Sequence, residues 1–316
     1  MSAFGWSSTT DEVLAGHDLS GLTVFITGAN SGLGQETARA MAAKGAHVVM
    51  AGREAAKLEA AVAAIRTSLP KAALETITID LASLESIRAA TSRARQRFER
   101  IDILINNAGV MATPFLHTSD GFEMQLGTNH LGHFAMTAEL MQLIERGAAK
   151  RIVNLSSRGH FMGPVRFDDP NFERGPYDPW ASYGQSKTAN ILFSVGLEQR
   201  FAVLGIHAYA VHPGGIQTNL GRHMSEEMAA ALMAQVTASD RGFRWKSLAQ
   251  GAATSCWAAT APELEGRGGV YCEDCHVAAV DDVSPTRGVR SYALNPSFAD
   301  QLWKLSETLT GARFPS

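Results

Sequence analysis

A glycine-rich turn between a short apolar strand and a helix is the feature that most constrains this chain. Residues 24–26 (VFI) lead into residues 27–34 (TGANSGLG), and an Ala-rich stretch follows. Glycine adopts positive φ and lets the backbone approach a pyrophosphate without a Cβ in the way. The helix that follows would offer free N–H groups and the positive end of its dipole to the anion. This order of elements predicts the phosphate-binding unit of a dinucleotide fold.

The rest of the chain repeats an alternation of β-branched runs and Ala-rich amphipathic stretches, typical of a parallel sheet with helices on both faces. With 316 residues, 45% of them hydrophobic, the chain can bury a large core. We expect an α/β, Rossmann-type doubly wound fold with a mainly seven-stranded parallel sheet, in a single domain over 1–316. Strands are expected at 23–27, 47–51, 74–79, 103–106, 151–155, 205–211 and near 269–271, and helices at 33–44, 54–68, 83–98, 121–146, 181–203 and 246–259.

Three segments depart from this alternation. Residues 1–20 are expected to form an N-terminal extension, and residues 158–180, rich in Gly, Pro and aromatic residues, an ordered loop. Residues 219–245 carry a stripe of methionines near helical spacing, Met224, Met228 and Met233, and end in Phe243 and Trp245. Such a stripe usually marks a helix packed on the core. Its place directly after a predicted cofactor loop favours a mobile substrate lid instead. The opposing wall is expected to contain Phe161, Phe172 and Trp180.

The end of the second expected strand indicates which cofactor is bound. A site that prefers NAD has a carboxylate there, which accepts a hydrogen bond from the ribose 2′-hydroxyl. Here Gly52 takes that position and Arg53 follows it. A guanidinium group suits a 2′-phosphate through its charge and paired donors. The alternative is a solvated arginine at the start of a helix. The prediction is that NADP(H) is preferred over NAD(H).

Tyr183 and Lys187 are four residues apart on an expected helix, and therefore one turn apart on the same face. Ketone reduction needs a proton for the developing alkoxide, and alcohol oxidation needs that proton removed. A free tyrosine, with a pKa of about 10, is a poor base at neutral pH. A neighbouring ammonium group would lower that pKa. Because an isolated Tyr-x-x-x-Lys is most often a surface pair, the other motifs decide its meaning.

Six short motifs share their order with one enzyme family: 27–34 (TGANSGLG), 106–109 (NNAG), 128–134 (TNHLGHF), 154–157 (NLSS), 183–187 (YGQSK) and 212–214 (HPG). On these motifs the chain resembles the short-chain dehydrogenase/reductases. It is most similar to the branch with the retinol dehydrogenases, the oxidoreductase domain of the WW-domain-containing oxidoreductase and the protochlorophyllide reductases. The resemblance extends from about residue 11 to about residue 308, and residues 250–254 (QGAAT) and 262–266 (PELEG) are features of this branch.

The resemblance implies roles for four residues. Tyr183 would be the acid/base, and Lys187 would also bind the nicotinamide ribose. Ser157 would donate a hydrogen bond to the substrate oxygen. Ser156 competes for that role, since alternation along a strand points the two hydroxyls to opposite faces, but the family pattern favours the second serine. Asn129 would hold a water that links Lys187 to solvent.

The resemblance also implies the cofactor contacts. The residues after the third expected strand would contact the adenine, and the NNAG motif would line a ribose. The threonine after the HPG motif would bind the carboxamide or the pyrophosphate. The full predicted cofactor set is Gly28, Asn30, Ser31, Gly32, Leu33, Gly34, Arg53, Asp80, Leu81, Asn107, Ala108, Gly109, Tyr183, Lys187, Pro213, Gly214 and Thr218.

Other classes of function are disfavoured. A net charge of −3 gives no basic field for nucleic acid. We find no apolar run of about 18 residues that would span a membrane and no signal-peptide pattern at the start. Three cysteines suit a reducing cytoplasm better than a disulfide framework. The pair Cys272 and Cys275 lacks the second pair that a structural zinc needs, so no metal is expected. His130 and His133 are expected to be ordinary helical histidines.

The leading hypothesis is an NADP(H)-dependent enzyme that moves a hydride to or from the carbonyl or alcohol carbon of a lipophilic alcohol, ketone or aldehyde. Two alternatives stay open: an NADPH-dependent ene-reductase that uses the same Tyr/Lys pair, and a nucleotide-binding scaffold without turnover. Intact Ser157, Tyr183 and Lys187 argue against the scaffold. A homodimer or homotetramer is a possible assembly.

Overall fold

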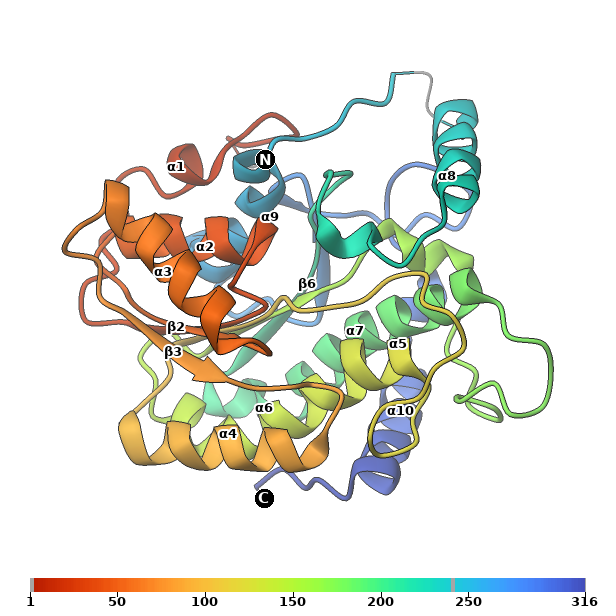
Figure 1. Ribbon diagram of the computed structural model, residues 1–316, viewed down its shortest axis with the longest axis horizontal. Coiled ribbons are helices and arrows are strands. Elements are labelled where there is room, and N and C mark those ends of the chain that lie inside the picture. Colours follow the sequence, from red (N-terminus) through yellow and green to blue (C-terminus); the bar gives the residue numbers. More distant parts are fainter. Residues whose placement is uncertain (1–2, 240–241, 316) are drawn as a thin grey trace.

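The apolar runs form one sheet whose strands are parallel except at one edge (Figure 1), in a computed structural model that describes residues 3–239 and 242–315. The spatial order is β3-β2-β1-β4-β5-β6-β7-β8, and β8 alone runs antiparallel. The strands are β1 (Thr23–Thr27), β2 (His47–Gly52), β3 (Leu74–Thr78), β4 (Ile103–Asn106), β5 (Arg151–Leu155), β6 (His207–His212), β7 (Val270–Glu273) and β8 (His276–Val277). The predicted doubly wound fold with seven parallel strands is confirmed, and a short antiparallel strand is added.

Helices cover both faces of the sheet because its strands are apolar on both sides. Val24 and Ile26 face the core beneath one helical layer, whereas Phe25 between them faces the core beneath the other. The first layer holds α2 (Gly32–Ala43), α3 (Ala55–Ser68) and α9 (Leu248–Thr260). The second holds α4 (Leu84–Arg97), α6 (Gly132–Glu145) and α7 (Pro179–Phe201), with α10 (Pro296–Thr310) packed on α7.

The order of the strands determines where a ligand site can form. β1 lies between β2 and β4, so the chain reverses its direction of winding at this strand. In open α/β sheets, a crevice for ligands forms outside the carboxyl ends of the strands at such a point. The glycine-rich turn after β1 and the residues after β4 and β5 therefore meet at one edge.

The expected helix over 121–146 is interrupted. It begins with α5 (Met124–Leu126), passes through a π-helical turn at Gly127–Leu131 and continues as α6. π turns occur often at functional sites because the extra residue redirects side chains. This one contains Asn129.

The Cys-x-x-Cys segment is a hairpin turn. Asp274 and Cys275 have φ of 47° and 57° and connect β7 to β8, a backbone that tight hairpins require. All three cysteines are free and buried. In the described part of the chain no group of His, Cys, Asp or Glu side chains could hold a metal ion.

The two segments expected at the periphery differ in their packing. In the N-terminal extension, α1 (Thr10–Val13) packs on α9, and Leu14 is completely buried. In the segment 219–245, α8 (Glu226–Ser239) has no buried side chain among its described residues, and it stands apart from both helical layers (Figure 1). The methionine stripe is therefore not packed in the core. None of the helices over the described residues is both long and apolar enough to cross a membrane.

Candidate active site

A groove of about 1870 Å³ lies along the carboxyl edge of the sheet. It is lined by residues from the turns after β1, β2, β4, β5 and β6 and from the start of α7. Every residue of the predicted cofactor set lines it, and so does Ser157. Asn129 lies behind the groove and is completely buried. The fold thus brings together residues that are up to about 190 positions apart in the sequence.

The glycine-rich turn has the close packing that a phosphate-binding loop needs. Gly28 has φ of 66°, and a Cβ on Gly34 would lie only 2.4 Å from the Gly28 carbonyl oxygen. Side chains are therefore excluded at both positions. Ser31 caps α2 without a side-chain hydrogen bond to the first turn, so its hydroxyl does not occupy the N–H groups there. These N–H groups at a helix N-terminus fit the pyrophosphate of a dinucleotide.

Thr27 ties this turn to the strand beside it. Its Oγ1 accepts hydrogen bonds from the backbone N–H groups of Asn107 (2.9 Å) and Ala108 (3.0 Å). The Asn107 side chain donates to the Thr27 carbonyl at 2.8 Å. The Asn107 amide therefore holds two cofactor-lining turns together. The sequence predicts a ribose contact for Asn107 and no role for Thr27.

The end of β2 meets the same turn. A Cβ on Gly52 would lie 3.1 Å from Asn30 Oδ1, so the backbone before Arg53 packs directly against the glycine-rich turn. Arg53 is exposed at the mouth of the groove and has no ion pair with any carboxylate that the structure describes. Lys57, one helical turn away, is paired with Glu54 at 2.7 Å. Arg53 is therefore a cation left available at this end.

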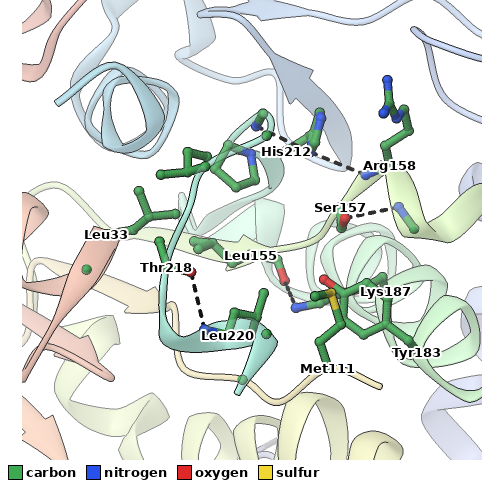
Figure 2. Close-up of a pocket in the computed structure, with 18 of the residues that line it drawn as sticks. Leu33, Met111, Leu155, Ser157, Arg158, Tyr183, Lys187, His212, Thr218 and Leu220 are labelled. Atoms are coloured by element: carbon green, nitrogen blue, oxygen red, sulfur yellow. Dashed lines mark hydrogen bonds between the residues drawn. The ribbon is translucent and has the colours of Figure 1, made fainter. Parts of the chain in front are cut away.

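Tyr183 and Lys187 lie side by side on α7 and face the groove (Figure 2). Asp178 caps this helix by accepting from the Trp180 N–H at 2.8 Å, and Pro179 takes the first helical position. Both side chains are only 4% exposed. Lys187 Nζ donates to the Leu155 carbonyl at 3.1 Å and lies 5.6 Å from the centre of the Tyr183 ring.

The pKa of Tyr183 differs from the expectation. Burial raises it to about 12, and hydrogen bonding by Ser157 offsets only part of this rise. Burial also lowers the pKa of Lys187 to about 8. The expected lowering of the Tyr183 pKa by Lys187 is not found, because both groups are removed from water and the ammonium group is directed at the Leu155 carbonyl. At neutral pH the phenol is therefore protonated.

The structure separates the two candidate serines. The Ser156 hydroxyl is buried and donates to the Lys187 carbonyl at 2.9 Å. The Ser157 hydroxyl accepts from the Gly159 N–H at 3.0 Å and lies at the groove beside Tyr183 (Figure 2). The Ser157 hydroxyl also hydrogen-bonds Tyr183, so it is placed where a substrate oxygen beside Tyr183 would accept its proton. The substrate role of Ser157 stays a prediction.

Asn129 is held by bonds at both ends of its side chain. Its Oδ1 accepts from the Val110 N–H at 2.8 Å, and its Nδ2 donates to the Val110 carbonyl and to Ser186 Oγ, both at 2.9 Å. The backbone carbonyl of Asn129 is hydrogen-bonded to His133 Nδ1 at 2.9 Å. The π turn is thus fastened to the segment after β4. The role of Asn129 in a water relay stays a prediction.

The two histidines of this helix are buried and bonded to neutral groups. His133 bridges Thr27 Oγ1 and the Asn129 carbonyl, and burial lowers its pKa to about 4. His130 bonds Ser306 Oγ at 2.8 Å. Both are therefore neutral at physiological pH, as expected of structural histidines.

Large apolar side chains form part of the lining of the groove. Phe161, Met162 and Trp180 come from the chain before Tyr183, and Met224, Met233, Phe243 and Trp245 come from the segment 219–245. The expectation for Phe172 is wrong: it is buried, has φ of 57° and packs against the Tyr177 ring at 5.4 Å. Its reversed backbone turns the ring to the interior. Met228 also does not line the groove.

Two residues that sequence reasoning missed support the segment 219–245 at its end. Trp6 lines the groove and stacks beneath Arg244 at 5.0 Å and Lys246 at 5.8 Å. The Lys246 side chain is almost completely buried, and its Nζ pairs with Asp274 at 2.5 Å. A Cβ on Gly214 would lie 2.8 Å from Lys246 Cδ. No motif or spacing pointed to either residue.

Comparison with known proteins gives a consistent result. The sequence model described as short chain dehydrogenase matches residues 22–229. Retinol dehydrogenase 14 of Homo sapiens is 38% identical over 307 residues, which cover 92% of this chain and 87% of that protein. Short-chain dehydrogenase/reductase prx1 of Penicillium roqueforti is 40% identical over 292 residues, covering 89% and 83%.

Solved structures share the architecture. A crystal structure of a protein from Mycobacterium paratuberculosis superposes with a TM-score of 0.72 at 35% identity and covers 95% of this chain and 97% of that one. The NADP complex of RhlG from Pseudomonas aeruginosa gives a TM-score of 0.63 at 23% identity, with coverage of 81% and 95%. At the latter identity the likeness concerns the fold alone.

Proposed function

Because the chain belongs to the short-chain dehydrogenase/reductase family of NAD(P)(H)-dependent oxidoreductases, we propose that it transfers a hydride between NADP(H) and a carbonyl or alcohol carbon of a lipophilic small molecule. One observation carries this proposal. Ser157, Tyr183 and Lys187 face the same groove as the phosphate-binding turn, and large apolar side chains line it too. The cofactor would supply or accept the hydride, held by the turn at 27–34 and by Lys187.

The chain's own residues handle the proton. In reduction, Tyr183 would donate its phenolic proton to the developing alkoxide, and its pKa of about 12 keeps it in the required neutral form at pH 7. In oxidation the phenolate would be the base. Ser157 would donate to the same oxygen and stabilise its negative charge.

The lining of the groove supports a lipophilic substrate. Aromatic and methionine side chains line the same groove as Tyr183, and such side chains adapt to varied apolar groups. The name of the human relative, retinol dehydrogenase 14, points to the same substrate class. The cytoplasmic location and an assembly of two or four copies stay predictions.

The direct test is a panel of lipophilic alcohols with NADP⁺, and of matched ketones, aldehydes and enones with NADPH, read at the nicotinamide absorbance. We expect turnover of alcohols and carbonyls. Reduction confined to the C=C bond of the enones would favour an ene-reductase. Tight NADPH binding without turnover of any panel member would favour a scaffold.

Arg53→Ala is expected to weaken NADP(H) selectively, because only the 2′-phosphate loses its partner. Loss of one charge-assisted hydrogen bond is worth roughly 1.5–3 kcal/mol, or about 10- to 150-fold in Kd. Calorimetric titration with NADPH and NADH measures this directly. Lys57→Ala is the matched control, since Lys57 is already paired with Glu54. Equal weakening of both cofactors by Arg53→Ala would show that Arg53 contacts a group they share.

The segment 219–245 is expected to act as a lid over the substrate. Its helix α8 has no buried side chain among the described residues, so few contacts oppose its opening. Amide hydrogen exchange should be fast over 219–239 in the free protein and slow once NADP(H) and a substrate analogue are bound. The central strands β1 and β4 serve as the internal reference. Protection equal to theirs in the free protein would contradict a lid.

A further inference from the structure

We propose that Arg222 is a second binding residue for the 2′-phosphate of NADP(H), placed on the lid segment opposite Arg53. This inference rests on the proposed preference for NADP(H) and adds a residue that no motif indicated. It concerns the nucleotide end of the groove, away from Tyr183.

The first support is that the chain segments carrying the two arginines pack against one turn. The backbone before Arg53 packs against Asn30, with 3.1 Å between a Cβ on Gly52 and Asn30 Oδ1. On the other side, a Cβ on Gly32 would lie 3.6 Å from Thr218 Cγ2. Asn30 and Gly32 are two residues apart in the phosphate-binding turn. The chain segments that carry the two arginines therefore pack against the same turn, and both arginines line the same groove.

The second support is the local structure that positions Arg222. Thr218 Oγ1 accepts from the Leu220 N–H at 3.3 Å and starts a short 3-10 turn, Asn219–Gly221 (Figure 2). Arg222 follows this turn, and its Nη1 donates to the Asn219 carbonyl at 3.0 Å. One bond of a five-donor guanidinium is used, which fixes its direction and leaves a fork of N–H groups for an anion.

The third support is the charge around Arg222. Over the residues that the structure describes, no carboxylate forms an ion pair with Arg222 or Arg53. Burial lowers the pKa of Arg222, and the positive charge of Arg53 lowers it further. Burial lowers the pKa of His223 as well, and the positive charges of Arg222 and Arg53 lower it further. Glu54 also lines the groove, but it is paired with Lys57. Two cations that line one groove without a carboxylate paired to either repel each other, and an anion between them removes that repulsion.

A 2′-phosphate is the anion that fits this position. Arg53 stands where the family places the partner of the ribose 2′ substituent, at the end of β2. A phosphate carries enough negative charge and oxygen acceptors for two guanidinium groups. Binding NADP(H) would thus also fasten the start of the lid segment, whereas NAD(H) would leave Arg222 without a partner.

The test is equilibrium binding of NADPH, NADH, adenosine 2′,5′-bisphosphate and AMP to the wild type, Arg222→Ala, Arg222→Gln and Arg53→Ala. Both Arg222 variants should weaken NADPH and the bisphosphate by about tenfold or more, with NADH and AMP changed by about twofold or less. Arg244→Ala is the matched control, because Arg244 lies on the same segment but stacks on Trp6. It should leave the ratio of the NADPH and NADH affinities unchanged.

Two results would overturn the inference: equal weakening of NADPH and NADH by the Arg222 variants, which would indicate a pyrophosphate contact, or no weakening of NADPH at all. Arg53→Ala separates this failure from failure of the proposed cofactor preference. Selective weakening by Arg53→Ala but not by the Arg222 variants rejects Arg222 alone. If neither Arg53→Ala nor the Arg222 variants weaken NADPH more than NADH, both the preference for NADP(H) and the inference are rejected.

Discussion

Tyr183→Phe is expected to lower kcat by roughly 10²–10⁴-fold while the affinity for NADPH changes little. The variant removes the only atom that transfers the proton and keeps the ring. That ring is closely packed, since a Cβ on Gly159 would lie 2.6 Å from Tyr183 Cε1. Steady-state kinetics on the best panel substrate and a binding titration measure the two quantities. More than about a tenth of wild-type kcat would rule out Tyr183 as the acid/base.

The same residue sets the pH dependence. A pKa raised to about 12 means that the base form of Tyr183 is scarce at neutral pH and grows as pH rises. Alcohol oxidation should therefore accelerate from pH 7 to 10, by up to about tenfold per unit, and carbonyl reduction should not. Residual oxidation by Tyr183→Phe should lack this slope. A slope that survives in the variant would belong to another group.

Ser157→Ala is expected to lower kcat by roughly 10²–10³-fold, the usual loss when one donor to a developing oxyanion is removed. It should also move the rise of oxidation with pH to higher pH, because Ser157 is the hydrogen-bonding group that lowers the pKa of Tyr183. A merely structural serine would not shift that profile.

Ser156→Ala is the matched control for this prediction. Its hydroxyl bonds the Lys187 carbonyl, so its loss should cost about 1 kcal/mol in the free energy of unfolding and leave the pH profile in place. If Ser156→Ala shifts the profile and Ser157→Ala does not, the two serines have been assigned the wrong way round.

The strands of the sheet were the most predictable part of the fold. β1, β4 and β5 begin and end where the sequence indicated, because strands buried on both faces are continuous apolar runs. The π turn at Gly127–Leu131 was not predictable, since Asn129 is held by Val110 and Ser186 from distant segments. β8 was also missed: it has two residues, and its turn uses Asp274 and Cys275 where a glycine would have signalled a hairpin.

The candidate site was also predictable in some features and not in others. Ser157, Tyr183 and Lys187 were placed at one groove because their motifs have a fixed order, although their roles stay predictions. The pKa of Tyr183 was not predictable, since it follows from burial that no spacing encodes. Phe172 was misplaced because its positive φ, rare for an aromatic residue, reverses the direction of the ring.

The contact of Trp6 with Arg244 and Lys246 has a consequence for redesign of this enzyme. Stacking of a cation on an indole ring is worth roughly 0.5–1 kcal/mol at an exposed site. Two such contacts join residues that are about 240 positions apart. A lid segment 219–245 exchanged with that of a relative would lose the contact of Arg244 with Trp6 unless residue 6 is exchanged with it. The transferable unit of specificity is thus discontinuous in the sequence, with one part at residue 6 and the other in the segment 219–245.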